Sequence, residues 1–262
     1  MKGGRRLLAA HTALVYFFLY APIAILVIFS FNSARQTAFW EGFTLDWYRQ
    51  LLGNPLLLRS VRNSLVVAGA TTVISVLLGT PAALAMARLR FRGRRSTQGL
   101  LFLPVIIPEV VLGAALVTFF GAVQMRLSLW TVIMAHVVFC VSYVAIVVRA
   151  RLAGLDPSLE EAARDLGAGP FETFRRVTLP LIAPGILASA LLVFTLSIDD
   201  YVVTSFVAGV GATTLPLHIY SMLKVGVTPE VNAVSTLLLA ATIFLIVVAH
   251  RLLQDSPEKD RS

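Results

Sequence analysis

Long apolar runs separated by shorter polar connections dominate the chain. A helix needs about 20 apolar residues to cross the hydrocarbon core of a bilayer, and six runs of roughly that length occur. They cover residues 8–31, 63–87, 99–121, 128–148, 185–208 and 232–250. The pattern predicts an all-α membrane protein with six transmembrane helices. Because we find no internal repeat, low-complexity linker or separate soluble domain, we expect residues 1–262 to form a single transmembrane domain.

The first apolar run has an alternative interpretation as a signal peptide, because Lys2, Arg5 and Arg6 precede it. The apolar region of a signal peptide is about 7–15 residues long and is followed by a cleavage site of small residues. The run at 8–31 is far longer and lacks such a site. We therefore expect it to be retained as a membrane helix.

The composition supports a membrane protein. Hydrophobic residues make up 57% of the chain and charged residues 14%, against about 25% charged residues in an average soluble domain. The net charge of +8 raises the question of nucleic acid, but the 22 Lys and Arg residues lie between the apolar runs, so we expect no nucleic-acid partner. The single cysteine, Cys140, excludes an intrachain disulfide, a clustered-cysteine zinc site and a CxxC pair, and we expect no metal site.

The distribution of Lys and Arg predicts the orientation, because positively charged flanks stay on the cytoplasmic side. Sixteen of the 22 lie before the first run, in the connections 88–98 and 149–184, and in the tail. The other side holds Arg35, Arg49, Arg59, Arg62, Arg126 and Lys224. Aromatic residues typical of the membrane interface fall on this second side: Trp40, Trp47, Tyr48 and Trp130. Both termini are therefore predicted to be cytoplasmic.

The outer connection, 32–62, has the pattern of a short surface helix closed by a turn at Gly53-Asn54-Pro55.

The long cytoplasmic connection contains the signals of a short helix. Asp156 or Ser158 can cap its start, Glu160 and Glu161 complement its positive end, and Gly167 ends it after about ten residues. Apolar residues fall at i, i+3, i+4 and i+7, namely Leu159, Ala162, Ala163 and Leu166. A segment this short is unstable alone, so something must cover this stripe. Periodicity does not decide between the ends of this chain's own helices and a groove on a partner.

A spaced motif in this connection resembles a known family. Glu161-Ala162-Ala163 is followed after three residues by Gly167, and then by Val177 and Leu179-Pro180. This resembles the EAA loop in permease subunits of bacterial binding-protein-dependent ABC importers, in which isoleucine is usual at the position of Val177. The resemblance implies a type I ABC importer permease fold in which residues 156–180 form the coupling loop. Leu159, Ala162, Ala163 and Leu166 would then dock on the ATP-binding subunit, Glu161 would engage its surface, and Gly167 would supply the turn.

The same resemblance implies that ATP is hydrolysed on another chain. No GxxxxGK[ST] phosphate-binding loop occurs, and Gly209-Val210-Gly211 lacks the lysine. We therefore expect no catalytic residue and no cofactor in this chain, with ATP and Mg bound by the partner. The implied partners are a dimer of ATP-binding subunits, a homologous second permease subunit and an extracytoplasmic solute-binding protein. The implied location is the bacterial inner membrane.

Ionisable residues inside the apolar runs are candidates for a solute pathway, because they are costly in lipid. The runs contain Glu109, His136, Asp199 and Asp200. Three acids and no Lys or Arg favour a cationic solute, and Glu109 lies in a stretch kinked by Pro104 and Pro108. The alternatives are that the aspartates cap a broken half-helix or pair with a companion subunit, and that His136, which is isolated in the sequence, is a packing residue.

Three further stretches sharpen the resemblance. Residues 43–52, 103–113 and 194–239 resemble the second permease subunit of spermidine/putrescine importers, which implies a polyamine solute. Two alternatives stay open. One is an ABC permease for another cationic or amino-acid-like solute, and the other is an ion-coupled secondary transporter that uses Glu109 and the aspartates.

Overall fold

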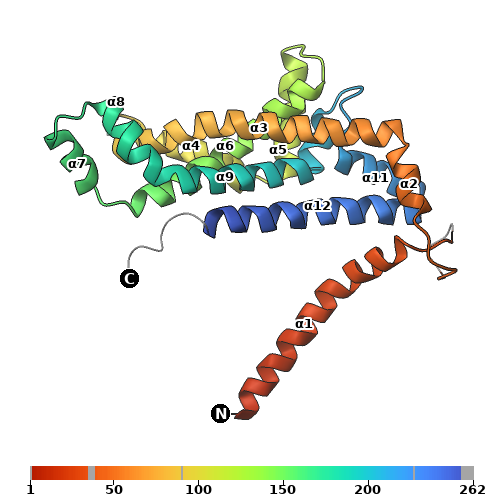
Figure 1. Ribbon diagram of the computed structural model, residues 1–262. Helices are drawn as coiled ribbons and strands as arrows, with labels where there is room; N and C mark the ends of the chain where they lie inside the picture. The colour runs from red at the N-terminus through yellow and green to blue at the C-terminus, as the bar shows by residue number, and fades with distance from the viewer. Residues whose placement is uncertain (1, 35–38, 90, 227, 255–262) are drawn as a thin grey trace. The chain divides into compact units, whose positions relative to one another are not determined.

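The computed structural model describes residues 2–34, 39–89, 91–226 and 228–254. Its helices are α1 (Lys2–Phe29), α2 (Asp46–Leu52), α3 (Pro55–Arg88), α4 (Arg94–Ile106), α5 (Glu109–Ala122), α6 (Leu129–Ala153), α7 (Ser158–Asp165), α8 (Pro170–Thr173), the π-helix η1 (Phe174–Thr178), α9 (Leu179–Asp199), α10 (Val202–Val207), α11 (Leu215–Val225) and α12 (Pro229–Gln254) (Figure 1). Apart from an isolated bridge between Asn32 and Phe43, the regular structure of the described chain is helical. Four residues counted for the orientation lie outside the described residues: Arg35, Arg90, Lys259 and Arg261.

The chain divides by its contacts into two compact units. Unit 1 comprises Met1–Leu58 and His218–Ile243, and unit 2 comprises Arg59–Leu217 and Phe244–Ser262. Helices α3, α11 and α12 each contribute to both units. The single transmembrane domain stays a prediction.

The described helices agree with an all-α membrane protein. Four are long and apolar enough to cross a bilayer: Arg5–Phe29, Pro55–Arg88, Leu129–Ala153 and Pro170–Asp199. The bent pair α4 and α5 makes a fifth if it forms one span, and α12 contributes a shorter apolar helix over Pro229–Phe244. The fold class is confirmed, whereas the count of six spans stays a prediction.

Two predicted spans are interrupted. The run 99–121 is broken between α4 and α5, which are bent by 110°. The break follows from Pro108, because a residue before proline is driven to an extended conformation, and Ile107 has φ −70° and ψ 132°. The run 185–208 is also not one helix, since α9 ends at Asp199 and Asp200 is extended, with φ −67° and ψ 123°. Pro108 marks the first break in the sequence, and the second lies at the aspartates, for which a broken half-helix was one of the alternatives.

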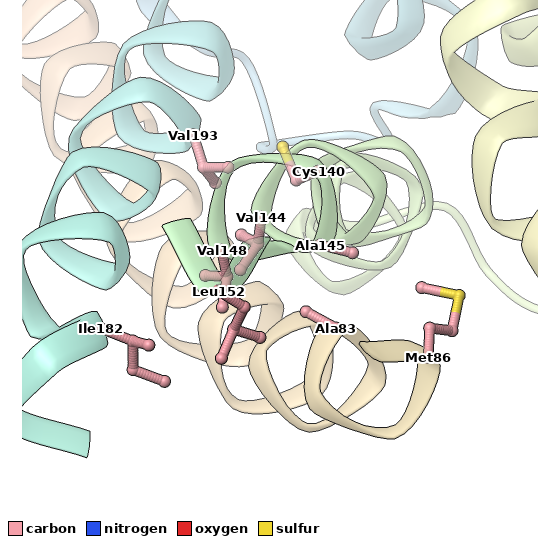
Figure 2. Packing of buried hydrophobic residues seen from close by; sticks show 9 residues of the cluster. All are labelled: Ala83, Met86, Cys140, Val144, Ala145, Val148, Leu152, Ile182 and Val193. Atoms are coloured by element: carbon pink, nitrogen blue, oxygen red, sulfur yellow. The ribbon is translucent and has the colours of Figure 1, made fainter. Parts of the chain in front are cut away.

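Unit 2 is held together by helix α6, which packs against α3 and α9. Its buried side chains meet those of the two neighbours in one cluster: Ala83, Met86, Cys140, Val144, Ala145, Val148, Leu152, Ile182 and Val193 (Figure 2). Helices α3 and α6 approach closely at Gly79, where an added Cβ would lie 2.7 Å from the Val144 Cβ. Burial of this apolar surface fixes the frame on which the polar residues of α6 and α9 are placed.

A second contact region orders the end of α10 and the segment that follows it. The Thr131 hydroxyl donates to the Val207 carbonyl at 2.8 Å. The Asn63 side-chain amide donates to the carbonyls of Gly211 and Thr213 at 3.0 and 2.9 Å. Residues 211–213 are thereby attached to α3.

Unit 1 contains α1, α2 and the first part of α12. The short helix predicted in the connection 32–62 is confirmed as α2, and the Asn54 carboxamide oxygen beyond it accepts from the Leu56 amide at 3.0 Å at the start of α3. The Trp47 indole donates to the Asn32 carbonyl at 2.8 Å. The apolar side chains of α1, such as Leu7 and Phe18, are exposed, as expected of a helix whose surroundings are lipid or another membrane helix.

Candidate functional site

The short helix predicted in the connection 149–184 is confirmed as α7. At its start the Asp156 carboxylate accepts from the Ser158 amide at 2.9 Å, and this hydrogen bond holds the pKa of Asp156 below its usual value. At its end Gly167 adopts φ +90°. The Gly167 amide donates to the Arg164 carbonyl at 2.9 Å and the Ala168 amide to the Ala163 carbonyl at 3.0 Å. This is a Schellman motif, so Gly167 supplies the turn that ends the helix.

The apolar stripe of α7 is largely uncovered by the described chain. Leu159 is 45% exposed and Leu166 90% exposed. Ala162 and Glu161 are exposed as well, and Ala163 is half-buried. Packing on this chain's own helices therefore covers little of the stripe, and docking of the two leucines in a partner's groove stays a prediction.

Glu160 has contacts that its position in the sequence did not reveal. Its Oε1 accepts from Arg88 Nη2 at 2.7 Å and from Thr178 Oγ1 at 2.8 Å. Its Oε2 lies 4.0 Å from Arg164 Nη2. The sequence pattern gave Glu160 only the role of complementing a helix N-terminus, because the partners at positions 88 and 178 are brought close by the fold.

Asp200 lies in a buried polar cluster at the break between α9 and α10. It accepts at Oδ2 from the Thr204 amide and hydroxyl at 2.8 and 2.7 Å, and at Oδ1 from the Val203 amide at 3.3 Å. Asp200 precedes Tyr201, the N-cap residue of α10, and its carboxylate satisfies first-turn amides that have no partner within the helix. Of the two alternatives for this residue, the capping of a broken half-helix is what the structure shows.

His136 belongs to the same cluster. This fully buried side chain of α6 has Nε2 3.1 Å from Asp200 Oδ2 and 3.0 Å from Thr204 Oγ1, and Nδ1 2.7 Å from Ser197 Oγ. Every polar atom of the ring is satisfied if Nε2 carries the proton and Ser197 donates to Nδ1. These contacts agree with the interpretation of His136 as a packing residue. Although it is isolated in the sequence, the fold brings to it partners that lie more than 60 positions away.

Asp199 and Glu109 are in a different situation from Asp200. Asp199 is the last residue of α9 and Glu109 the first of α5, and both side chains are exposed. Within the described residues neither carboxylate makes a hydrogen bond or an ion pair, and no contact joins Glu109 to the aspartates. The three predicted pathway acids are thus divided into one structural carboxylate and two that are available.

A metal site requires several side chains that bind the ion together. Among the residues that the structure describes, no group of three or more His, Cys, Asp and Glu side chains could hold a metal ion. Cys140 is free and buried in the apolar cluster around α6. The expectation of no cofactor in this chain stays a prediction.

An apolar helical chain of this kind, with an exposed helix between its long apolar helices, is the architecture of an integral membrane protein. Residues 75–256 match the family model of the binding-protein-dependent transport system inner membrane component, and the chain belongs to this family. The family assignment made from the EAA motif is thereby confirmed.

Relatives and solved structures agree with the assignment. The chain is 40% identical over 252 residues to the spermidine/putrescine transport system permease protein PotC of Escherichia coli (strain K12), covering 96% of both chains. It is 43% identical over 231 residues to the putrescine transport system permease protein PotI of the same strain, covering 86% of this chain and 82% of PotI. A chain of a bacterial ABC transporter for the acidic polysaccharide alginate has a TM-score of 0.78 at 18% identity, with 97% of both chains covered. A chain of the inward-facing MetNI methionine ABC transporter has a TM-score of 0.68 at 21% identity, covering 78% of this chain and 97% of that one. At these identities the structural likeness shows the fold.

Proposed function

We propose that this chain is a permease subunit of an ATP-driven polyamine importer, with ATP hydrolysed on a separate subunit that docks on α7. The observation that carries the polyamine assignment is the similarity over 96% of the chain to a spermidine/putrescine permease. The exposed carboxylate of Asp199 and the uncovered stripe of α7 support the two halves of the proposal, the solute and the energy source.

The proposed coupling site is the exposed face of α7. Leu159 and Leu166 insert into a groove of the ATP-binding subunit, Ala162 and Ala163 allow a close approach, and Glu161 engages the rim. Two exposed leucines on one turn-capped helix are suited to this role, because buried apolar anchors supply most of the binding energy at protein interfaces. The turn at Gly167 fixes where the chain leaves the groove.

The proposed solute contacts are Asp199 and Glu109. A polyamine carries several ammonium groups, each of which a carboxylate attracts. At a given distance this attraction is stronger in a low-dielectric environment than in water. Asp200 has a supporting role here, since its oxygens are already used by Thr204 and His136. Another organic cation would use the same carboxylates, and an uptake panel distinguishes these solutes.

The remaining subunits follow from the type of importer. A homologous second permease covers part of the exposed apolar surface, a dimer of ATP-binding subunits engages the coupling loops, and an extracytoplasmic solute-binding protein delivers the polyamine. The distribution of Lys and Arg supports an orientation in a bacterial inner membrane with both termini on the cytoplasmic side.

Uptake by the reconstituted complex tests the proposal. The chain is reconstituted in liposomes with the ATP-binding subunit, second permease and solute-binding protein of its own organism, and uptake of labelled spermidine, putrescine and a panel of amino acids is measured. ATP-dependent polyamine uptake is expected. Asp199→Asn should lower it about tenfold, equivalent to one lost charge-assisted contact, whereas Glu172→Gln, which removes an exposed acid from the loop, should not.

Three outcomes would contradict the proposal. Preference for a solute without ammonium groups would overturn the polyamine assignment. Ion-driven uptake without the ATP-binding subunit would identify a secondary transporter. If Asp199→Asn and Glu109→Gln both leave uptake unchanged, these carboxylates do not contact the solute.

A further inference from the structure

One acidic side chain of helix α7 is bonded to two other helices of unit 2. No residue of α7 is buried, yet the Glu160 side chain is only 13% exposed. Its Oε1 accepts two short hydrogen bonds, from Arg88 Nη2 at 2.7 Å and from Thr178 Oγ1 at 2.8 Å. Bonds of this length between charged or hydroxyl donors and a carboxylate are among the strongest polar contacts in proteins.

The two donors belong to the ends of two long helices. Arg88 is the last residue of α3, and Thr178 is the last residue of η1, which continues directly into α9. In Figure 1, α7 and α8 lie at one end of α3 and α9. One carboxylate therefore connects α7 to two membrane-spanning helices at once.

No residue of α7 belongs to the two apolar clusters of the described chain. A cleft of about 380 Å³ separates these elements, with apolar walls from α3 and from the segment after α8, and Arg88, Glu160 and Thr178 line it. The π-helical turn at Phe174–Thr178 is an irregularity of the kind that is frequent at functional sites. The hydrogen bonds of Glu160 with Arg88 and Thr178 connect the elements that line this cleft.

We propose that Glu160 is a positioning residue that transmits displacement of α7 to α3 and α9. The inference rests on the proposed docking of an ATP-binding subunit on α7 and adds the route by which movement reaches the spans. When the docked helix moves, Arg88 and Thr178 follow the carboxylate, so the ends of α3 and α9 move with it. Without this link, α7 moves with the ATP-binding subunit while the spans stay behind.

An ordinary surface ion pair on the same loop provides the matched control. Glu172 and Arg176 approach to 3.2 Å with side chains 46% and 76% exposed. Exposed pairs of this kind contribute little. Removing the Glu172 charge therefore tests the loss of an acid from the loop, whereas removing the Glu160 charge tests the loss of the link.

The experiment compares ATP hydrolysed with polyamine imported in the reconstituted complex. Glu160→Gln should keep ATP hydrolysis and raise the ATP consumed per solute about tenfold, the factor that corresponds to a lost charge-assisted hydrogen bond. Thr178→Val, which removes one hydrogen bond with little change of shape, should raise it about threefold. Glu172→Gln should leave the ratio unchanged. The exchange Arg88→Glu with Glu160→Arg should bring the ratio back toward that of the wild type, although each single charge reversal raises it.

The results separate this inference from the proposed function. A normal ratio in both Glu160→Gln and Thr178→Val would overturn the link while ATP-dependent uptake by the wild type still supports the docking. A charge exchange that is no better than the single reversals would also overturn it. Absence of ATP-dependent uptake by the wild type would instead overturn the proposed function.

Discussion

At the loop that carries α7, apolar side chains are exposed on a polar segment, whereas at the junction of α9 and α10 polar side chains are buried inside an apolar one. Leu166 is 90% exposed and Leu159 is 45% exposed. His136 and Ser197, by contrast, are buried and bonded to each other at 2.7 Å. The exposed leucines of the loop lack a covering surface, whereas the buried polar groups of the junction are bonded to each other within this chain. Substitutions in the loop should therefore affect association, and substitutions at the junction should affect stability.

The adjacent aspartates give the sharpest test of this difference, with the largest expected effect. Asp200→Ala removes the acceptor of the first-turn amides of α10 and leaves His136 without its carboxylate partner. Together these losses should lower stability by about 3 kcal/mol. The measurement is the unfolding temperature of the purified complex in detergent.

The neighbouring acid is the control. Asp199→Ala removes a carboxylate that makes no hydrogen bond within the described chain, so its effect on stability should stay within about 0.5 kcal/mol. Equal destabilisation by the two substitutions would show that Asp200 is not the structural member of the pair.

The two regions also differ in how well the sequence predicts them. The helix α7, its end at Gly167 and the break at Pro108 depend on residues within a few positions of each other, and all three were predictable. A break capped by Asp199 or Asp200 was one of the alternatives for the junction, but the sequence did not decide it, because the apolar run continues past Asp199. The cluster joins His136 to residues more than 60 positions away, and the link from Glu160 to Arg88 spans 72 positions. Such contacts depend on the packing of α3, α6 and α9.

The exposed leucines of α7 give the next largest expected effect. Leu166→Ser should weaken binding of the ATP-binding subunit by about 2 kcal/mol, or roughly thirtyfold, because an apolar anchor is removed from the interface. The unfolding temperature should not change, since the side chain is exposed. Binding is measured by titration of the ATP-binding subunit onto the permease complex in lipid nanodiscs.

Val210 provides the control for this substitution. It is also fully exposed but lies in the glycine-rich segment after α10, which is predicted to be on the outer side. Val210→Ser should leave the affinity for the ATP-binding subunit unchanged. An affinity that Leu166→Ser does not alter would exclude this leucine from the docking surface.

The smallest expected effect comes from the turn that ends α7. Gly167 has φ +90° with no atom within 4 Å of an added Cβ, so Gly167→Ala is opposed by backbone conformation alone, at a cost of about 1 kcal/mol. Gly169, two residues on, has the ordinary φ of −68° and the same open surroundings, so Gly169→Ala should have almost no effect. Hydrogen exchange at the Gly167 and Ala168 amides measures the difference, because both donate to carbonyls of α7. Gly167→Ala should accelerate it about fivefold, the factor equivalent to 1 kcal/mol. Equal exchange in the two variants would mean that the turn is not held by the left-handed glycine, and that α7 ends for another reason.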